Sequence, residues 1–368
     1  MPNRTRHYFF LFLKVYLLAL LFSPLIQTAF SLSELSDLYQ SPQGLGMGNA
    51  LTADAAGYQT IYYNPAGVAN QFKRKWEVNL VDLEGSLGID TVSRVWKNQT
   101  FGPYRMFGEL KHNAGQYYFL NAATLPSFTM RGFSISGLGS YQFAGQSDGV
   151  SLDTDIRQDL GVAFAVGRSF AGNLLKLGLS GKVLIRNQMK GVFSHDTLAS
   201  LNDESFPTLF KEGWGFGFDL GMLVTLPEKF LPTFGIVWKD MFGTRFYKSN
   251  ILNAKALGVP DPIAQSVNAA ISIHPQFSRE LKSTIAFEYK HLELSTLPFR
   301  KHLHFGVQLE HIKEIYFWAG LYQLYPTAGL GYRVKGGNLE LTTYAVDTGE
   351  GENYRENRRF TFRYTISF

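Results

Sequence analysis

The chain has 368 residues, among them 31 Phe, 19 Tyr and 36 Gly, and it contains no cysteine, so it forms neither disulfides nor thiolate metal sites. Its formal net charge of +5 includes Arg4, Arg6 and Lys14 of the N-terminal stretch described next, and no basic face typical of a nucleic-acid-binding protein is visible. The mean hydropathy of −0.08 argues against a protein made of membrane-spanning helices, which need long apolar runs.

The one long apolar run, Val15 to Phe30, lies near the N-terminus. Basic residues precede it, and small residues follow at Ala29 and Ser31. This is the layout of a secretory signal peptide, so we expect residues 1–31 to be removed after Ser31. A retained N-terminal anchor is the alternative, although the run is short for a membrane span.

Residues 32–72 form a segment rich in Gly and Ala that shows no strand-like alternation. It contains Gly44-Leu45-Gly46-Met47-Gly48-Asn49 and, further on, Asn64-Pro65-Ala66-Gly67. The first motif is similar in letters to a dinucleotide-binding fingerprint. However, no strand–helix–strand unit surrounds it, and the fingerprint needs that context. The sequence therefore predicts no nucleotide cofactor.

From residue 73 onwards, apolar residues recur at every second position, which is typical of strands with two different faces. The clearest run is Gly213 to Leu226, where Trp, Phe, Leu, Met and Val alternate mostly with Gly. The weakest is 116–125. The expected strands are 76–80, 116–125, 131–143, 160–166, 175–186, 213–226, 234–238, 267–273, 281–289, 303–309, 315–321, 330–334, 339–341 and 357–368. They number about fourteen, an even number as bacterial outer-membrane barrels have.

Between residues 85 and 114 the alternation stops. Apolar residues there have helical spacing instead, at Val92, Val95 and Trp96 and again at Met106 and Leu110. We therefore expect short amphipathic helices on a loop.

The last expected strand, 357–368, shows the two faces most plainly. Phe360, Phe362 and Tyr364 lie on one face, and Arg and Thr residues lie between them. One face suits lipid and the other water. Because a bilayer offers no hydrogen bonds, a sheet that spans it must close on itself. A half-buried strand of a soluble sandwich alternates in the same way, so this strand alone leaves both folds open.

The lengths of the links between strands favour the membrane barrel. The links expected to be long are 144–156, 190–212, 242–263, 292–300 and 348–356, and those expected to be short are 171–173, 227–231, 275–279, 313 and 336–337. Only the short link at Tyr325-Pro326 departs from alternation. Outer-membrane barrels have short periplasmic turns and longer external loops, whereas a sandwich has no reason to sort its loops in this way.

Taken together, the Gly-rich motif, Asp54 and Asn64-Pro65-Ala66-Gly67 resemble the FadL-like family of outer-membrane transporters for long-chain fatty acids and other hydrophobic compounds. The wider superfamily includes PorV-like secretion barrels. The resemblance implies that residues 32–72 fold into the barrel lumen as a hatch, and the residues it assigns to the hatch are Gly44, Gly46, Gly48, Asn49, Asn64, Pro65, Ala66 and Gly67. The chain departs from the family after Asp54, where members often carry paired acidic residues.

The expected inner faces of 159–167 and 213–221 are mostly Gly and Ala. Small residues leave room for another backbone to approach, which agrees with a hatch. Strongly curved strands need the same residues, so the two explanations stay open.

Several polar residues are expected to line the lumen. Lys176, Lys182 and Arg186 share one inward face, and Asp219 faces inward on the next strand. These cations either attract an anionic headgroup or form charge pairs within an ordinary polar lumen. His302 and His304 also face inward, and a polar lining is favoured over a metal site, which needs ligands that the sequence does not place.

No other pattern indicates chemistry. The series Asp148, Asp153, Asp155 and Asp159 lacks the spacing of a calcium loop and is expected in a solvated loop. No nucleophile, base or carboxylate pair stands at a recognisable spacing. We therefore predict neither an enzyme nor a bound metal or cofactor.

The expected external loops carry many apolar residues, including Phe193, Phe206, Phe210, Phe242 and Phe246. Exposed apolar patches often mark binding sites, so these residues are candidates for ligand capture, although they are equally suited to pack on one another as a cap.

The sequence thus predicts an all-β transmembrane antiparallel barrel over residues 73–368, surrounded by lipid in the bacterial outer membrane. By resemblance, its function is passive uptake of hydrophobic or amphipathic small molecules such as long-chain fatty acids. The alternative is a scaffold or secretion-partner barrel whose loops bind other proteins.

Overall fold

The computed structural model describes residues 34–35, 37–70, 76–93, 103–202, 204–312, 314–349 and 354–368. The predicted signal peptide, and Val95 and Trp96 of the expected loop helices, lie outside these ranges. Among the residues described, no helix is long and apolar enough to cross a membrane.

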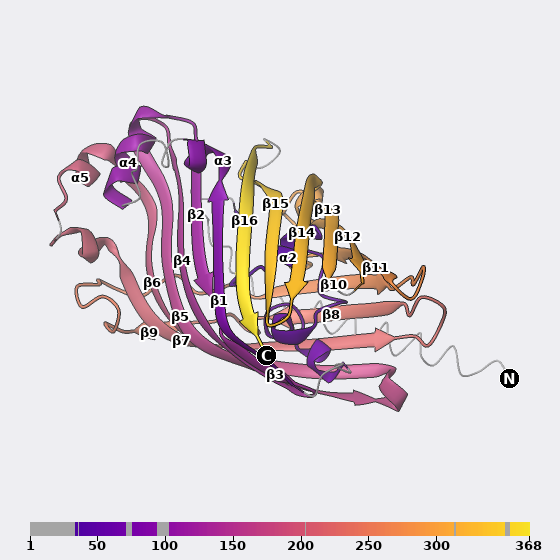
Figure 1. The fold of residues 1–368 in the computed structure, drawn as a ribbon. Helices are drawn as coiled ribbons and strands as arrows, with labels where there is room; N and C mark the ends of the chain where they lie inside the picture. The colour runs from indigo at the N-terminus through magenta and orange to yellow at the C-terminus, as the bar shows by residue number, and fades with distance from the viewer. Residues whose placement is uncertain are drawn as a thin grey trace. The chain divides into compact units, whose positions relative to one another are not determined.

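The residues after 75 form one antiparallel sheet that closes on itself (Figure 1). Its strands are β1 (Trp76–Gly88), β2 (Tyr117–Thr124), β3 (Ser127–Met130), β4 (Phe133–Ser147), β5 (Ser151–Phe170), β6 (Leu175–Ser194), β7 (Lys211–Thr225), β8 (Thr233–Lys239), β9 (Phe246–Lys248), β10 (Ser266–Ile273), β11 (Leu281–Tyr289), β12 (Leu303–His311), β13 (Ile315–Tyr322), β14 (Tyr325–Val334), β15 (Gly337–Asp347) and β16 (Glu356–Ser367). The last strand pairs with the first, with Phe360 opposite Leu87.

The barrel wall has 14 strands, which confirms the number expected from the alternation. Two of the sixteen named strands do not add to the wall. The strand β3 continues β2 in the same place between β1 and β4, and β9 is a short strand that pairs only with β7. Neighbouring strands follow one another in sequence around the whole ring, as in an up-and-down barrel.

The two faces of each strand are as different as the sequence predicts. On β16, Phe360 and Phe362 are exposed on the outside, whereas Arg359, Thr361 and Arg363 are buried inside. On β7, Trp214, Phe216 and Phe218 are likewise exposed. Large apolar side chains on the outside are costly in water but suit the hydrocarbon of a bilayer.

Short helices lie in the links: α3 (Ile89–Thr91) and α4 (Pro103–His112) between β1 and β2, η4 (Ala171–Asn173) between β5 and β6, α5 (His195–Ala199) and η5 (Phe206–Leu209) between β6 and β7, and α6 (Phe299–His302) before β12.

Two expected links differ from the structure. Instead of a long link at 144–156, β4 runs to Ser147 and β5 begins at Ser151. Of the acidic residues there, Asp148 lies in the turn, whereas Asp153 and Asp155 belong to β5, where Asp155 accepts a hydrogen bond from Gln188. Further along β5, Asp159 pairs with Arg186. The short link at Tyr325-Pro326 lies two residues earlier, at Gln323 and Leu324, where positive φ angles of 53° and 68° make the tight turn.

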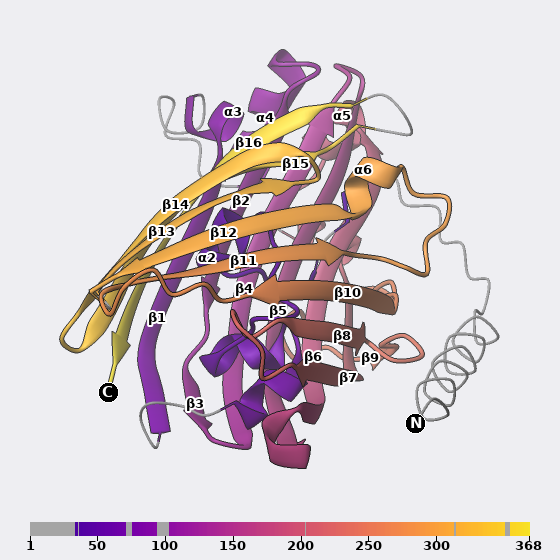
Figure 2. The same cartoon turned by 90° about the vertical axis from the view of Figure 1, so that its right-hand side faces the viewer.

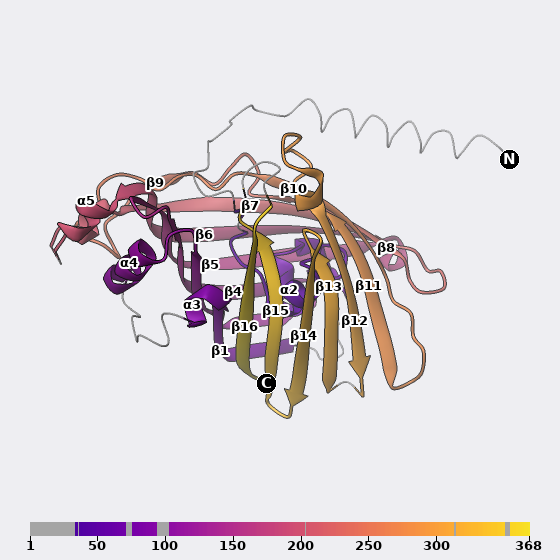
Figure 3. The same cartoon turned by 90° about the horizontal axis from the view of Figure 1, so that it is seen from above.

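The described residues before β1 form a separate segment, which we call the N-terminal segment (34–35 and 37–70). It contains α2 (Pro42–Gly46), η1 (Gly57–Ile61) and η2 (Pro65–Ala69). Its α2 contacts β13, β14 and β15, whereas η2 contacts β5, β6 and β7 on the other side of the ring. A segment that touches opposite sides of a closed barrel passes through its interior, as Figures 2 and 3 show for α2.

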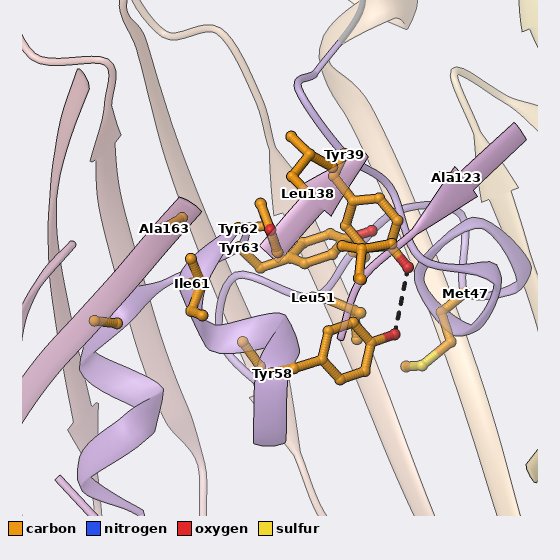
Figure 4. Packing of buried hydrophobic residues seen from close by; sticks show 14 of the residues in the cluster. Tyr39, Met47, Leu51, Tyr58, Ile61, Tyr62, Tyr63, Ala123, Leu138 and Ala163 are labelled. Carbon is orange, nitrogen blue, oxygen red and sulfur yellow. Dashed lines mark hydrogen bonds between the residues drawn. The ribbon is translucent and has the colours of Figure 1, made fainter. Parts of the chain in front are cut away.

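The main apolar core joins the N-terminal segment to the inner wall. Tyr39, Tyr58, Tyr62 and Tyr63 of the segment pack together, with the ring of Tyr39 5.0 Å from that of Tyr62 (Figure 4). The wall contributes mostly small or aliphatic residues to this core, namely Ala123, Leu125, Leu138, Ala163, Ala165, Leu184 and Ala286, together with Trp318. In this core, aromatic residues of the segment therefore pack against mostly small or aliphatic residues of the wall.

Candidate functional site

The candidate site is the contact between the N-terminal segment and the inner wall. At the second motif, the backbone of the segment lies directly on glycines of the wall. A Cβ atom on Gly178 of β6 would overlap the backbone of Pro65, and one on Gly221 of β7 would overlap the side chain of Asn64. These two glycines therefore leave room for the segment. In the expected inner faces, Gly167 and Gly221 do the same, whereas Gly213, Gly215 and Gly217 lie against the link that follows β8, so the segment accounts for only part of these glycines.

Asn64 organises this part of the segment. Its Oδ1 accepts a hydrogen bond from the backbone N–H of Ala66 at 3.0 Å, so it caps η2. Its Nδ2 donates to the carbonyl of Thr52 at 2.9 Å and, more weakly, to that of Met222 on β7 at 3.3 Å. Pro65, at the first helical position, has no N–H that would need an acceptor, and Gly67 lies so close to Ala55 that a Cβ would not fit. The four residues thus act as one packed unit.

The first motif is held by strands on the opposite side of the ring. Gly48 and Asn49 have positive φ angles of 60° and 63°, so the chain turns sharply after α2. Thr327 of β14 accepts from the N–H of Gly48 at 3.2 Å and donates to the carbonyl of Gly46 at 2.8 Å. His304 of β12 donates from Nδ1 to the carbonyl of Gly48 at 2.7 Å.

Acidic residues of the segment pair with basic residues of the wall. Asp37 lies 3.1 Å from Lys239 Nζ and 3.3 Å from Lys290 Nζ, and Glu34 lies 2.8 Å from Arg359. Burial raises the pKa of Asp37, but the two lysines lower it by more, so it lies well below its ordinary value. Asp37 is therefore ionised, and its charge holds the segment to the wall.

A further pair lies beside the link after β10. His274 Nε2 is 2.7 Å from Asp54 Oδ1. Burial lowers the pKa of His274, and Lys176 lowers it further. The hydrogen bond and charge of Asp54, together with the carbonyl of Leu231, raise it by more, so the net shift is upward. The contact with Asp54 therefore favours the protonated form of His274, and this pair ties Asp54 to the barrel.

Several solved structures share this architecture. The chain is similar to the CymD monoaromatic hydrocarbon channel, with 15% identity over 92% of this chain and 99% of that chain and a TM-score of 0.56. It is also similar to the Pseudomonas putida toluene transporter TodX, with 10% identity over 93% and 99% of the two chains and a TM-score of 0.51. The fold is that of the FadL-like channels. No protein-family model and no curated protein matches the sequence.

In this barrel, the predicted inward cations are paired with residues of the wall itself. Lys182 lies 2.9 Å from Asp219 and 3.0 Å from Asp240, and Arg186 lies 2.7 Å from Asp159. Lys176 donates to Thr225 at 2.9 Å. The structure thus brings Lys182 and Asp219 together, and charge pairing accounts for most of this group.

The two predicted lumen histidines serve different elements. His304 holds the segment, as described above, whereas His302 at the end of α6 donates from Nδ1 to the carbonyl of Lys290 at 2.6 Å. Within the described ranges, no three His, Asp or Glu side chains are grouped so as to hold a metal ion.

Three of the predicted loop aromatics join one apolar cluster. Phe206 and Phe210 have ring centroids 5.4 Å apart, and they pack with Phe193 against α4 and the strand ends. Phe193 itself is not in a loop, because β6 extends to Ser194. Of the other two, Phe246 lies in β9 and packs on the inner core, and Phe242 is 68% exposed.

This cluster covers the outer face of the wall. Phe143 and Ile156 have the same strand parity as the exposed Ile135 and Leu160, yet they are fully buried under residues of α4 and α5. The outward side chains at these strand ends are therefore covered by residues of α4 and α5. Figure 1 shows both helices near this end of the strands.

Sequence reasoning missed Asp37, Lys239 and Lys290. A signal was present for the lysines, because each follows an outward aromatic residue, Trp238 or Tyr289, and so has inward parity. Nothing in the sequence indicates their partner, because Asp37 reaches them only through the fold of the N-terminal segment.

Proposed function

We propose that this protein is a bacterial outer-membrane channel for passive uptake of hydrophobic or amphipathic small molecules, with the N-terminal segment as its hatch. The observation that carries this proposal is a closed, lipid-compatible barrel whose interior is crossed by a segment that is not part of the wall. The predicted signal peptide directs export to that membrane.

The proposed path begins at the apolar cluster on the long-loop end of the barrel. Phe193 and Phe206 are only partly buried there, so they offer apolar surface to an incoming ligand. The ligand then enters the lumen, where the aromatic rings of the hatch block its way, and it leaves through the barrel or its wall once the hatch rearranges.

The hatch is suited to move because the wall is complete without it. Every strand of the ring hydrogen-bonds to two neighbours, and none of these ladders includes a residue of the hatch. The hatch is held instead by side-chain hydrogen bonds, ion pairs and close packing on glycines. It is therefore able to leave its seat while the barrel stays folded.

A reversible cross-link tests this proposal. The chain has no native cysteine, so Ala53→Cys with Ser272→Cys forms a single defined pair between the hatch and β10, where Ser272 Oγ lies 3.3 Å from the carbonyl of Ala53. The matched control joins two neighbouring wall strands through Thr225→Cys and Thr233→Cys, which face each other at the ends of β7 and β8 with their Oγ1 atoms 3.2 Å apart.

Cells that lack the gene are complemented with each variant, outer-membrane fractionation is confirmed, and uptake of a labelled long-chain fatty acid and of labelled toluene is measured. We expect the oxidised hatch pair to stop uptake, reduction to restore it, and the wall pair to have no effect. Equal uptake by the oxidised and reduced hatch variants would contradict a moving hatch. Equal uptake by cells with and without the gene would favour the scaffold role.

A further inference from the structure

The inward cations fall into two groups according to where their partners lie. Lys182 and Arg186 pair with Asp219 and Asp159, so both members of each pair belong to the rigid wall. Lys239 and Lys290 are different, because Asp37, the acid between them, belongs to the hatch. When the hatch moves, pairs of the first group persist, whereas the Asp37 pairs break.

The surroundings of Asp37 have the composition of a carboxylate-binding site. Its two oxygens face Lys239 Nζ at 3.1 Å and Lys290 Nζ at 3.3 Å. The amides of Gln40 and Asn49 donate to Oδ2 at 3.3 and 3.4 Å. Both lysine side chains are at least nine-tenths buried. Donors therefore surround this carboxylate, and charge-assisted hydrogen bonds of this kind are strong.

The two lysines also have neighbours besides Asp37, one from the hatch and one from the wall. Their ammonium groups lie 5.5 and 5.8 Å from the centre of the ring of Tyr63, a hatch residue that moves with Asp37. Glu288 lies 3.8 Å from Lys290, so one wall carboxylate stays nearby, and it also accepts hydrogen bonds from Thr52 of the hatch. Removal of Asp37 leaves two cations facing one anion, which favours a replacement anion.

We propose that Lys239 and Lys290 form a binding site for the carboxylate of an anionic amphiphile, and that Asp37 occupies this site in the closed protein as a built-in competitor. This inference rests on the proposed function. A ligand carboxylate that takes the place of Asp37 releases the hatch, and the ligand's apolar chain occupies the lumen beside it.

The same contacts explain why the charge of the ligand matters. Movement of Asp37 without a replacement anion leaves two buried ammonium groups short of a partner, which is strongly unfavourable. A carboxylate from the ligand removes that penalty, whereas a neutral hydrocarbon does not. A ligand shifts the equilibrium between closed and open hatch only as far as it binds the open state more tightly than the closed one. The anionic ligand therefore opens this hatch more effectively than a neutral hydrocarbon does. Arg359, whose partner Glu34 lies three residues before Asp37, is a third cation that loses its partner in the same movement.

The test compares two ligands with the same apolar chain, dodecanoate and dodecanol, at a pH where dodecanoate is ionised. Affinities are measured calorimetrically for the full mature chain in lipid nanodiscs. Asp37→Asn removes the competing charge with little change in shape. We expect dodecanoate to bind this variant at least about tenfold more tightly than the wild type, and dodecanol to change by less than about twofold. Asp159→Asn, which removes an acid from a wall pair, is the matched control and leaves the ratio of the two affinities unchanged.

Replacement of either lysine should change the affinity for dodecanoate in the opposite direction. Lys239→Met and Lys290→Met, tested singly and checked for folding by circular dichroism, weaken dodecanoate binding at least about tenfold and leave dodecanol unchanged. A purely structural role for Asp37 predicts instead that Asp37→Asn leaves the preference for dodecanoate over dodecanol as it was, and that result overturns the inference. Absence of binding of both ligands to the wild type and to Asp37→Asn contradicts the proposed function itself, so the two failures are distinguishable.

Discussion

Asn64 gives the sharpest prediction about how firmly the hatch is seated. Its side chain is fully buried and makes two hydrogen bonds of 3.0 Å or less, from the N–H of Ala66 and to the carbonyl of Thr52. Asn64→Ala removes both and leaves their backbone partners buried and unpaired. Both bonds lie within the hatch, so the cost to the seated state comes from the two backbone groups that stay buried without a partner; at about 1–2 kcal/mol for each group, it is about 2–4 kcal/mol. That corresponds to about a 30- to 700-fold larger fraction of unseated hatch.

The assay uses the reactivity of a single engineered cysteine. Ala53→Cys places a buried thiol at the contact between hatch and wall, and its modification rate by a membrane-impermeant thiol reagent reports the unseated fraction. We expect Asn64→Ala to accelerate modification by about the factor above, with unfolding of the barrel in urea unchanged. The matched control is Asn79→Ala, which removes a 2.9 Å hydrogen bond to Ser127 within the wall and leaves the rate alone. An acceleration below about threefold, or equal acceleration by the control, would refute the reasoning.

Three other perturbations have definite expected results. Because the seated His274 has a raised pKa, its pair with Asp54 stabilises the seated hatch fully below the ordinary histidine pKa of about 6.5 and loses this effect as pH rises through the raised value. The test compares the modification rates of the Ala53→Cys protein with and without His274→Gln at each pH. The rate with His274 present, divided by the rate with His274→Gln, should rise with pH. A constant ratio would count against a role for the pair. Gly178→Val inserts a side chain where Pro65 lies, so it should unseat the hatch and increase permeation of a labelled hydrophobic compound, while wall stability, measured by urea unfolding, stays near that of the wild type. Phe216→Lys places a charge on the exposed apolar face and should destabilise the barrel in lipid by about 2–4 kcal/mol if that face lies near the bilayer midplane; an unchanged urea midpoint would argue that lipid does not cover it.

The sequence predicted the wall well because its outer face obeys a simple rule. Lipid requires an apolar residue at every second position, so runs such as Gly213 to Leu226 are visible without any knowledge of the neighbouring strands. The prediction was wrong where strands extend beyond the exposed apolar residues. Asp153 and Asp155 resemble a solvated loop, yet they belong to β5, because the outer side there is covered by helices and the inner side supplies Gln188 and other partners.

The site was predictable only where both partners lie on the wall. Lys182 and Asp219 were placed on one inner face from parity alone, and the structure joins them. The contacts of Asp37 with Lys239 and Lys290 bridge 202 and 253 positions of sequence, and they depend on a hatch that has no repeating pattern. The motifs around Gly48 and Asn64 indicated that the segment is special, but not which side chains it presents to the wall.

The seam between β1 and β16 has a consequence for how the protein is assembled. The described part of the hatch reaches residue 70, a few positions before β1, and β1 is one of the two strands that close the ring. The hatch is therefore attached at the seam itself, so a sheet that curls around it encloses it before the last strand pairs. Pairing of β16 with β1 is then the step that encloses the hatch in the barrel. If the last strand is displaced, the aromatic core is exposed to the surroundings as well as one edge of the sheet.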